Sequence, residues 1–121
     1  MSYLGYEPES QEVADNTRKL ILSEANPFYY AGTKLSGIGS PHTPVRYVWH
    51  ISKAIEGLTA PTKEEKHQMI HELMATDGGT GLMHEGVFVD DPTVYTREWF
   101  SWATAMFCEL VMQYCGYEVK K

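Results

Sequence analysis

TREWFSWATAMFCELVMQ, residues 96–113, places apolar and aromatic side chains on nearly every side of a predicted helix. A helix that is apolar around its circumference should be buried on several sides. The segment TKEEKHQMIHELM, residues 62–74, predicts another helix, because Thr62 and Glu65 have capping-box spacing directly after Pro61. Its predicted buried face consists of Met69, Ile70, Leu73 and Met74.

Two more helices complete the predicted architecture. One spans residues 11–23 with Ser10 as its N-cap, and the other begins after Pro44 and runs to about Glu56, with Gly57 as its stop. No convincing alternation marks a strand. Two connections of about twenty residues carry aromatic side chains among their glycines, so we expect them to be ordered. The predicted fold is therefore all-α, with about four helices and two long ordered loops in a single segment, residues 1–121.

Composition limits the possible functions. The 121 residues are 43% hydrophobic and carry a net charge of −6, which fits one soluble globular domain or a piece of a larger one and argues against nucleic acid as a partner. The sequence shows neither a membrane-spanning run nor a signal-peptide pattern, which predicts no membrane association and a cytoplasmic location. Cys108 and Cys115 lie too far apart on one helix for a disulfide.

Two glycine-bracketed motifs carry the candidate chemistry: GIGSPHTP, residues 37–44, and GLMHEG, residues 81–86. Ser40, His42 and Thr43 precede a predicted helix, where hydroxyls and free N–H groups can bind an oxygen-rich ligand. Thr43 also fits a simple N-cap. For His42, structural hydrogen bonding and ligand binding remain equally open.

The second motif offers an acid or base. Glu85 lies in a loop that backbone and ligand can approach closely, and the neighbouring imidazole of His84 can tune the carboxylate or bind the same substrate. The alternative is an ordinary surface carboxylate. Trp49 and Trp99, near loop and helix junctions, are candidates to line a pocket, whereas Trp102 fits the core.

A metal site is the weaker alternative. His67 and His71 stand four residues apart, a spacing at which two imidazoles can share a metal, but both occupy the polar face of a predicted helix. The pair His84-Glu85 does not fit the zinc-protease pattern, because Phe88 occupies the place of the second histidine.

Several motifs together resemble the C-terminal third of glycoside hydrolase family 125. The similarity extends in order and spacing over nearly the whole chain, and it includes the two glycine-bracketed motifs and the segment that contains Trp99. The matching segments are YLGY (3–6), NTRK (16–19), NPFYY (26–30), YVW (47–49), EGLT (56–59), TGLMHE (80–85), DP (91–92), YTR (95–97) and WFSWA (99–103).

The resemblance implies part of an (α/α)6 toroid and an inverting, metal-independent exo-α-1,6-mannosidase that needs no cofactor. It assigns the general base to Glu85 and a substrate-binding role to Ser40, His42, Thr43, Trp49, His84 and Trp99. The general acid is an aspartate that the family carries upstream of this segment. An inverting enzyme needs both carboxyl groups, because one protonates the leaving oxygen while the other activates water.

The missing acid leads us to expect a fragment that is inactive by itself. Its partners would be an α-mannoside oligosaccharide, the missing N-terminal part, or a second copy of the chain. The alternative is a carbohydrate-binding remnant that lost catalysis. The chain departs from the family pattern at Gly86-Val87 (usually Ser-Phe), His50 and Glu98 (usually prolines) and Thr104 (usually asparagine).

Overall fold

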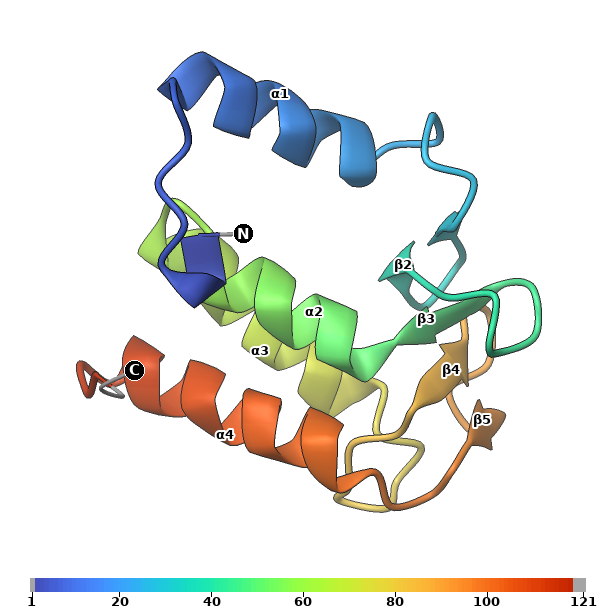
Figure 1. The fold of residues 1–121 in the computed structure, drawn as a ribbon. Helices are drawn as coiled ribbons and strands as arrows, with labels where there is room; N and C mark the ends of the chain where they lie inside the picture. Colours follow the sequence, from blue (N-terminus) through green and yellow to red (C-terminus); the bar gives the residue numbers. More distant parts are fainter. Residues whose placement is uncertain (1, 119–121) are drawn as a thin grey trace.

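The computed structural model describes residues 2–118, which contain four α-helices, a 3₁₀ helix and two small antiparallel sheets (Figure 1). Helices α2, α3 and α4 pack together, while α1 lies on the side of α2 opposite α4. No helix among these residues is long and apolar enough to cross a membrane. The helices are η1 (Ser2–Leu4), α1 (Gln11–Ile21), α2 (His50–Leu58), α3 (Lys63–Ala75) and α4 (Ser101–Tyr114).

The two sheets make the fold mixed α/β, so the all-α prediction is wrong. Strands β1 (Tyr29–Ala31) and β2 (Ser36–Ile38) form one sheet, and the three others form a second sheet in the order β3-β4-β5. Strands β1, β2 and β4 lie in segments that were expected to be loops, whereas β3 occupies the first turn of a predicted helix and β5 ends where the last helix was expected to begin. The three-stranded sheet consists of β3 (Tyr47–Trp49), β4 (Gly86–Phe88) and β5 (Tyr95–Thr96).

The strands escaped prediction because they are only two or three residues long, too short to display alternation. Their aromatic and β-branched residues favour extended backbone, but only pairing across the chain stabilises it. Trp49 pairs with Gly86, and Gly86 pairs with Thr96 on its other side. Gly86 allows this close packing, since a Cβ there would lie 3.2 Å from both Thr43 Cγ2 and Thr96 Oγ1.

Two of the four helix starts were predicted correctly. The hydroxyl of Ser10 accepts the N–H of Val13, and the hydroxyl of Thr62 accepts the N–H of Glu65, which confirms both N-caps. Helix α2 begins after β3 instead of after Pro44, and α4 begins at Ser101 instead of near residue 96.

The predicted helix stop, Gly57, instead lies inside α2, where it serves close packing of α2 against its neighbours. A Cβ at this position would lie 2.7 Å from Leu110 Cδ2 and 3.0 Å from Met69 Cβ. The main core forms at this contact between α2, α3 and α4. Its buried members are Ile51, Ala54, Leu58, Met69, Leu73, Met83, Ala103, Met106 and Leu110.

Two residues predicted for the core lie outside it. Trp102 is 59% exposed and Met74 is 60% exposed, because each lies on the outer side of its helix. Helix α4 is thus buried along one stripe, at Ala103, Met106 and Leu110, and not on several sides.

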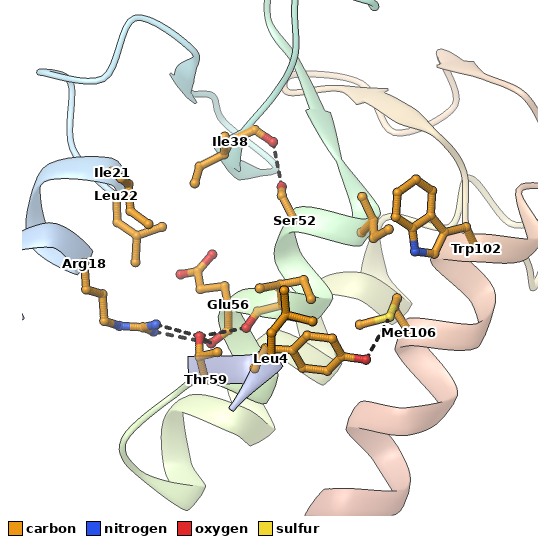
Figure 2. A pocket seen from close by; sticks show the side chains of 13 residues that line it. Leu4, Arg18, Ile21, Leu22, Ile38, Ser52, Glu56, Thr59, Trp102 and Met106 are labelled. Carbon is orange, nitrogen blue, oxygen red and sulfur yellow. Dashed lines mark hydrogen bonds between the residues drawn. The ribbon is translucent and has the colours of Figure 1, made fainter. Parts of the chain in front are cut away.

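Helix α1 has no buried residue, and its apolar side chains Val13 and Leu20 are more than half exposed. A largely apolar cavity of about 470 Å³ lies beside it, between α1, α2 and α4 (Figure 2). The cavity is lined by Ile21, Ile38, Ile51, Ile55, Trp102 and Met106, among others.

Candidate active site

Glu85 directly precedes β4 (Gly86–Phe88), and its backbone is held there by hydrogen bonds. Its N–H donates to the Thr96 carbonyl at 3.2 Å, and the next N–H, of Gly86, donates to the Thr96 hydroxyl at 3.0 Å. The carboxylate side chain is 17% exposed, and its Oε2 lies 3.3 Å from the Nε of Arg97. Glu85 therefore presents a partly accessible carboxylate from a well-anchored position.

Arg97 was not among the predicted site residues. Its side chain is 66% exposed, it stacks over the Phe100 ring, and its φ of 49° places it in the left-handed region. Non-glycine residues with positive φ are uncommon and often mark functional loops. The sequence did not single out Arg97, because neither its left-handed backbone nor its pairing with Glu85 can be read from the residue type.

Four of the predicted site residues lie together beside β4. The indole N–H of Trp49 donates to the Thr43 hydroxyl at 2.9 Å, and the rings of His42 and Trp49 are 6.5 Å apart. The Ser40 hydroxyl accepts the N–H of His42. Trp49 pairs with Gly86, the residue after Glu85, so this group lies beside the start of β4.

Thr43 does not cap α2, because β3 separates the two. Its hydroxyl instead accepts from Trp49 and lies 3.3 Å from the Ser40 carbonyl. His42 is exposed, whereas Thr43 is buried. The segment from Ser40 to Thr43 is thus a compact turn that presents His42 outward.

His84 is completely buried, so it does not present its ring to a ligand as expected. Its Nδ1 lies 2.6 Å from the Glu98 carbonyl oxygen, and its Nε2 lies 2.8 Å from the Asp77 carbonyl oxygen. The ring stacks on Tyr95 with 3.8 Å between centroids and an angle of 1°. His84 therefore connects the segment after α3 to the segment before α4.

His50, another buried histidine, joins the same cluster from α2. Its Nδ1 accepts the backbone N–H of His84 at 2.9 Å, and its Nε2 lies 3.2 Å from the Thr76 hydroxyl. Burial, and next the positive charge of His84, lower the pKa of His50 from 6.5 to about 3. His50 is therefore neutral, with its single N–H on Nε2 directed at Thr76.

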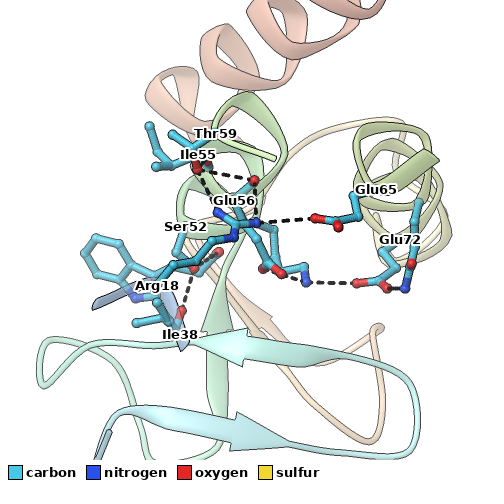
Figure 3. A network of polar contacts seen from close by, with 11 residues as sticks. Arg18, Ile38, Ser52, Ile55, Glu56, Thr59, Glu65 and Glu72 are labelled. Atoms are coloured by element: carbon cyan, nitrogen blue, oxygen red, sulfur yellow. Dashed lines mark hydrogen bonds and ion pairs between the residues drawn. The ribbon is translucent and has the colours of Figure 1, made fainter. Parts of the chain in front are cut away.

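A second polar network holds α2 against β2 and α3 (Figure 3). The Lys53 side chain is 4% exposed, and its Nζ lies 2.9 Å from a carboxylate oxygen of both Glu56 and Glu72, so a buried charge faces two opposite charges. The Ser52 hydroxyl lies 2.6 Å from the Ile38 carbonyl oxygen. These contacts fix the end of β2, from which the Ser40–Thr43 turn continues.

The remaining candidates lie apart from this group. Trp99 is 71% exposed in the segment that precedes α4. His67 is exposed on α3, where its ring packs 5.7 Å from Tyr114. Within residues 2–118, no three His, Cys, Asp or Glu side chains are grouped as metal ligands.

The sequence profile of the metal-independent alpha-mannosidases, glycoside hydrolase family 125, matches residues 1–112. The chain belongs to this family. A family 125 resemblance seen in the motifs of residues 37–44 and 81–86 is thereby confirmed over most of the sequence.

Two relatives support the assignment to family 125. A solved metal-independent α-mannosidase from Streptococcus pneumoniae, in a non-productive complex with α-1,6-mannobiose, is 53% identical and superimposes on 97% of this chain with a TM-score of 0.93. The meiotically up-regulated gene 157 protein of Schizosaccharomyces pombe is 42% identical over 113 residues, or 93% of this chain. The chain spans 28% of the first protein and 22% of the second.

Proposed function

We propose that this chain forms the base-bearing portion of an inverting exo-α-1,6-mannosidase, with Glu85 as the general base. The observation that carries the proposal is the anchored, partly exposed Glu85 carboxylate in a chain 53% identical to a mannosidase solved with α-1,6-mannobiose. Inversion requires a carboxylate that activates water on the face of the sugar opposite the leaving group. The fixed backbone on both sides of Glu85 suits that role, because it leaves the carboxylate little freedom.

The neighbouring side chains would bind the sugar. The Trp49 indole offers a flat apolar face, while the exposed His42 offers ring nitrogens that can bond sugar hydroxyls. Ser40 and Thr43 hold the turn that carries His42, through the contacts described above. Arg97 pairs with Glu85 and would keep its carboxylate oriented until substrate binds.

The proposal also requires a general acid, about 6.5 to 9.5 Å from Glu85 in inverting enzymes. In this proposal the acid comes from outside residues 1–121, as the family resemblance implies. We therefore expect this chain to bind α-1,6-mannobiose weakly and to hydrolyse it only when the remainder of the catalytic domain is supplied.

A chimera tests the role of Glu85 in a complete site. Residues 1–118 of this chain would replace the matching segment of the streptococcal enzyme, and hydrolysis of α-1,6-mannobiose would be followed by NMR. We expect β-mannose as the first product, and a loss of about 10²- to 10⁴-fold in kcat for Glu85→Gln. The matched control is Glu64→Gln, an exposed carboxylate on α3, which should leave kcat unchanged.

Two results would overturn the proposal. An active chimera in which Glu85→Gln retains full kcat would remove Glu85 as the base. A folded chimera that binds mannobiose without hydrolysing it would instead favour a carbohydrate-binding remnant.

A further inference from the structure

The two ring nitrogens of His84 both face carbonyl oxygens. The Nδ1 atom lies 2.6 Å from Glu98 O, and the Nε2 atom lies 2.8 Å from Asp77 O. A neutral imidazole carries one N–H, so its other nitrogen would direct a lone pair at a carbonyl lone pair. At these distances such an arrangement is repulsive, and the repulsion is avoided at both carbonyls only if each ring nitrogen carries an N–H.

A nearby hydroxyl does not change this conclusion. Thr80 Oγ1 lies 3.4 Å from His84 Nε2, but its hydrogen is directed at the Asp77 carbonyl, 2.7 Å away. The same oxygen accepts the N–H of Leu82 at 3.1 Å. Thr80 thus uses its hydrogen elsewhere, and the Nε2 of His84 has no donor within normal hydrogen-bond distance.

The surroundings of the ring suit a positive charge. The parallel face of Tyr95 lies 3.8 Å away and provides a cation–π contact. The Asp77 segment follows α3, and its carboxylate accepts the N–H groups of Gly79 and Gly81. From α2, the neighbouring ring of His50 accepts the backbone N–H of His84 and remains neutral.

The same contacts determine the backbone around Glu85. His84 holds the segments at Asp77 and Glu98 on its two sides, and its own N–H is held by His50. Glu85, the next residue, continues this fixed backbone into β4 through its bond to Thr96. Two loop segments and one helix end therefore meet at a single buried ring.

We propose that His84 is a buried, doubly protonated imidazolium that positions Glu85 by bonding the carbonyls of Asp77 and Glu98. This makes His84 a positioning residue and not a sugar contact, and it rests on the proposed role of Glu85. The charged ring would then belong to the residue next to the base, and Arg97 supplies a second cation, which contacts the carboxylate directly.

Protonation can be measured directly on this chain by two-bond ¹H–¹⁵N correlation of its five histidines near pH 7. We expect His84 to show two protonated ring nitrogens and His50 to show a hydrogen on Nε2 only. Single His→Gln variants assign the signals. A His84 spectrum with one protonated and one unprotonated nitrogen overturns the proposal, and this measurement on the wild-type chain stands even if His84→Gln does not fold.

Positioning is tested separately. In His84→Gln, amide hydrogen exchange at Glu85 and Gly86 should accelerate about tenfold or more, which corresponds to about 1.4 kcal/mol of lost local stability. His67→Gln, at an exposed position of α3, is the control and should leave both amides unchanged. Unchanged exchange in His84→Gln would contradict the positioning role.

The chimera separates this inference from the proposed function. His84→Gln should lower kcat for α-1,6-mannobiose far more than it raises KM, because it displaces the base without removing a sugar contact. If Glu85→Gln leaves kcat intact while the NMR spectrum shows a doubly protonated His84, the base assignment fails and the charged ring remains. If KM alone rises in His84→Gln, the ring acts in binding and the positioning role is wrong.

Discussion

Helix α2 separates two regions that are held together in different ways. At its N-terminal end, His50, His84 and Thr76 are fully buried and every ring nitrogen faces a polar partner. On the other side, α1 buries no residue and is attached mainly through Arg18, whose guanidinium donates to Thr59 and to the Glu56 carbonyl. Buried polar networks fix one geometry because each unmatched group is costly. An exposed amphipathic helix imposes no such requirement.

The largest difference between the two regions should appear with matched leucine substitutions. Leu110, in the core between α2 and α4, is fully buried, whereas Leu20 on α1 is 56% exposed. We expect Leu110→Ala to lower the free energy of unfolding by about 2 to 5 kcal/mol through lost burial and a cavity. Leu20→Ala should change it by less than about 0.5 kcal/mol. Urea denaturation of both variants measures the contrast, and equal losses would refute it.

Acid should destabilise the site region next. The pKa of His50 falls from 6.5 in the unfolded chain to about 3 in the folded chain, so the unfolded state binds the extra proton between these values. Stability should therefore decrease as the pH falls below 6.5, by at most about 1.4 kcal/mol per pH unit from this group. His50→Gln should flatten the decrease between pH 6.5 and 5, whereas His67→Gln should not. An unaltered slope in His50→Gln would contradict the neutral, buried ring.

A smaller effect is expected where α1 meets α2. Arg18→Gln removes the two hydrogen bonds to Thr59 and Glu56, in a side chain that is 29% exposed. The expected loss is about 1 kcal/mol, confined largely to α1. Hydrogen exchange should accelerate in α1 and stay constant in β4. Lys19→Gln, which replaces an exposed neighbour of the same charge, is the control.

Leu20→Gln should have the smallest effect on stability but a clear effect on self-association of the chain. Leu20→Gln removes apolar surface from an exposed position, so the free energy of unfolding should change by less than about 0.5 kcal/mol. If apolar groups of α1 drive self-association, the variant should sediment as a smaller species than the wild type at equal concentration. Identical sedimentation of the variant and the wild type would show that Leu20 does not contribute to self-association.

Local signals in the sequence identified where two of the helices begin. Capping by Ser10 and Thr62 depends on residues three positions apart, so α1 and α3 were predicted close to their observed starts. The order and spacing of the two glycine-bracketed motifs and the other matching segments allowed the family to be recognised. Burial was predicted less well. Trp102 and Met74 have core-like side chains, yet the packing of α2, α3 and α4 leaves both exposed.

Four helices, the positions of the two motifs and the membership in family 125 could be read from the sequence, because they depend on neighbouring residues or on an ordered pattern. Tertiary structure alone decided the five short strands and the role of His84. Strands of two or three residues gain stability only from partners far along the chain, as when Trp49 pairs with Gly86. Likewise, whether a histidine meets a ligand or two buried carbonyls depends on which segments the fold brings to its ring.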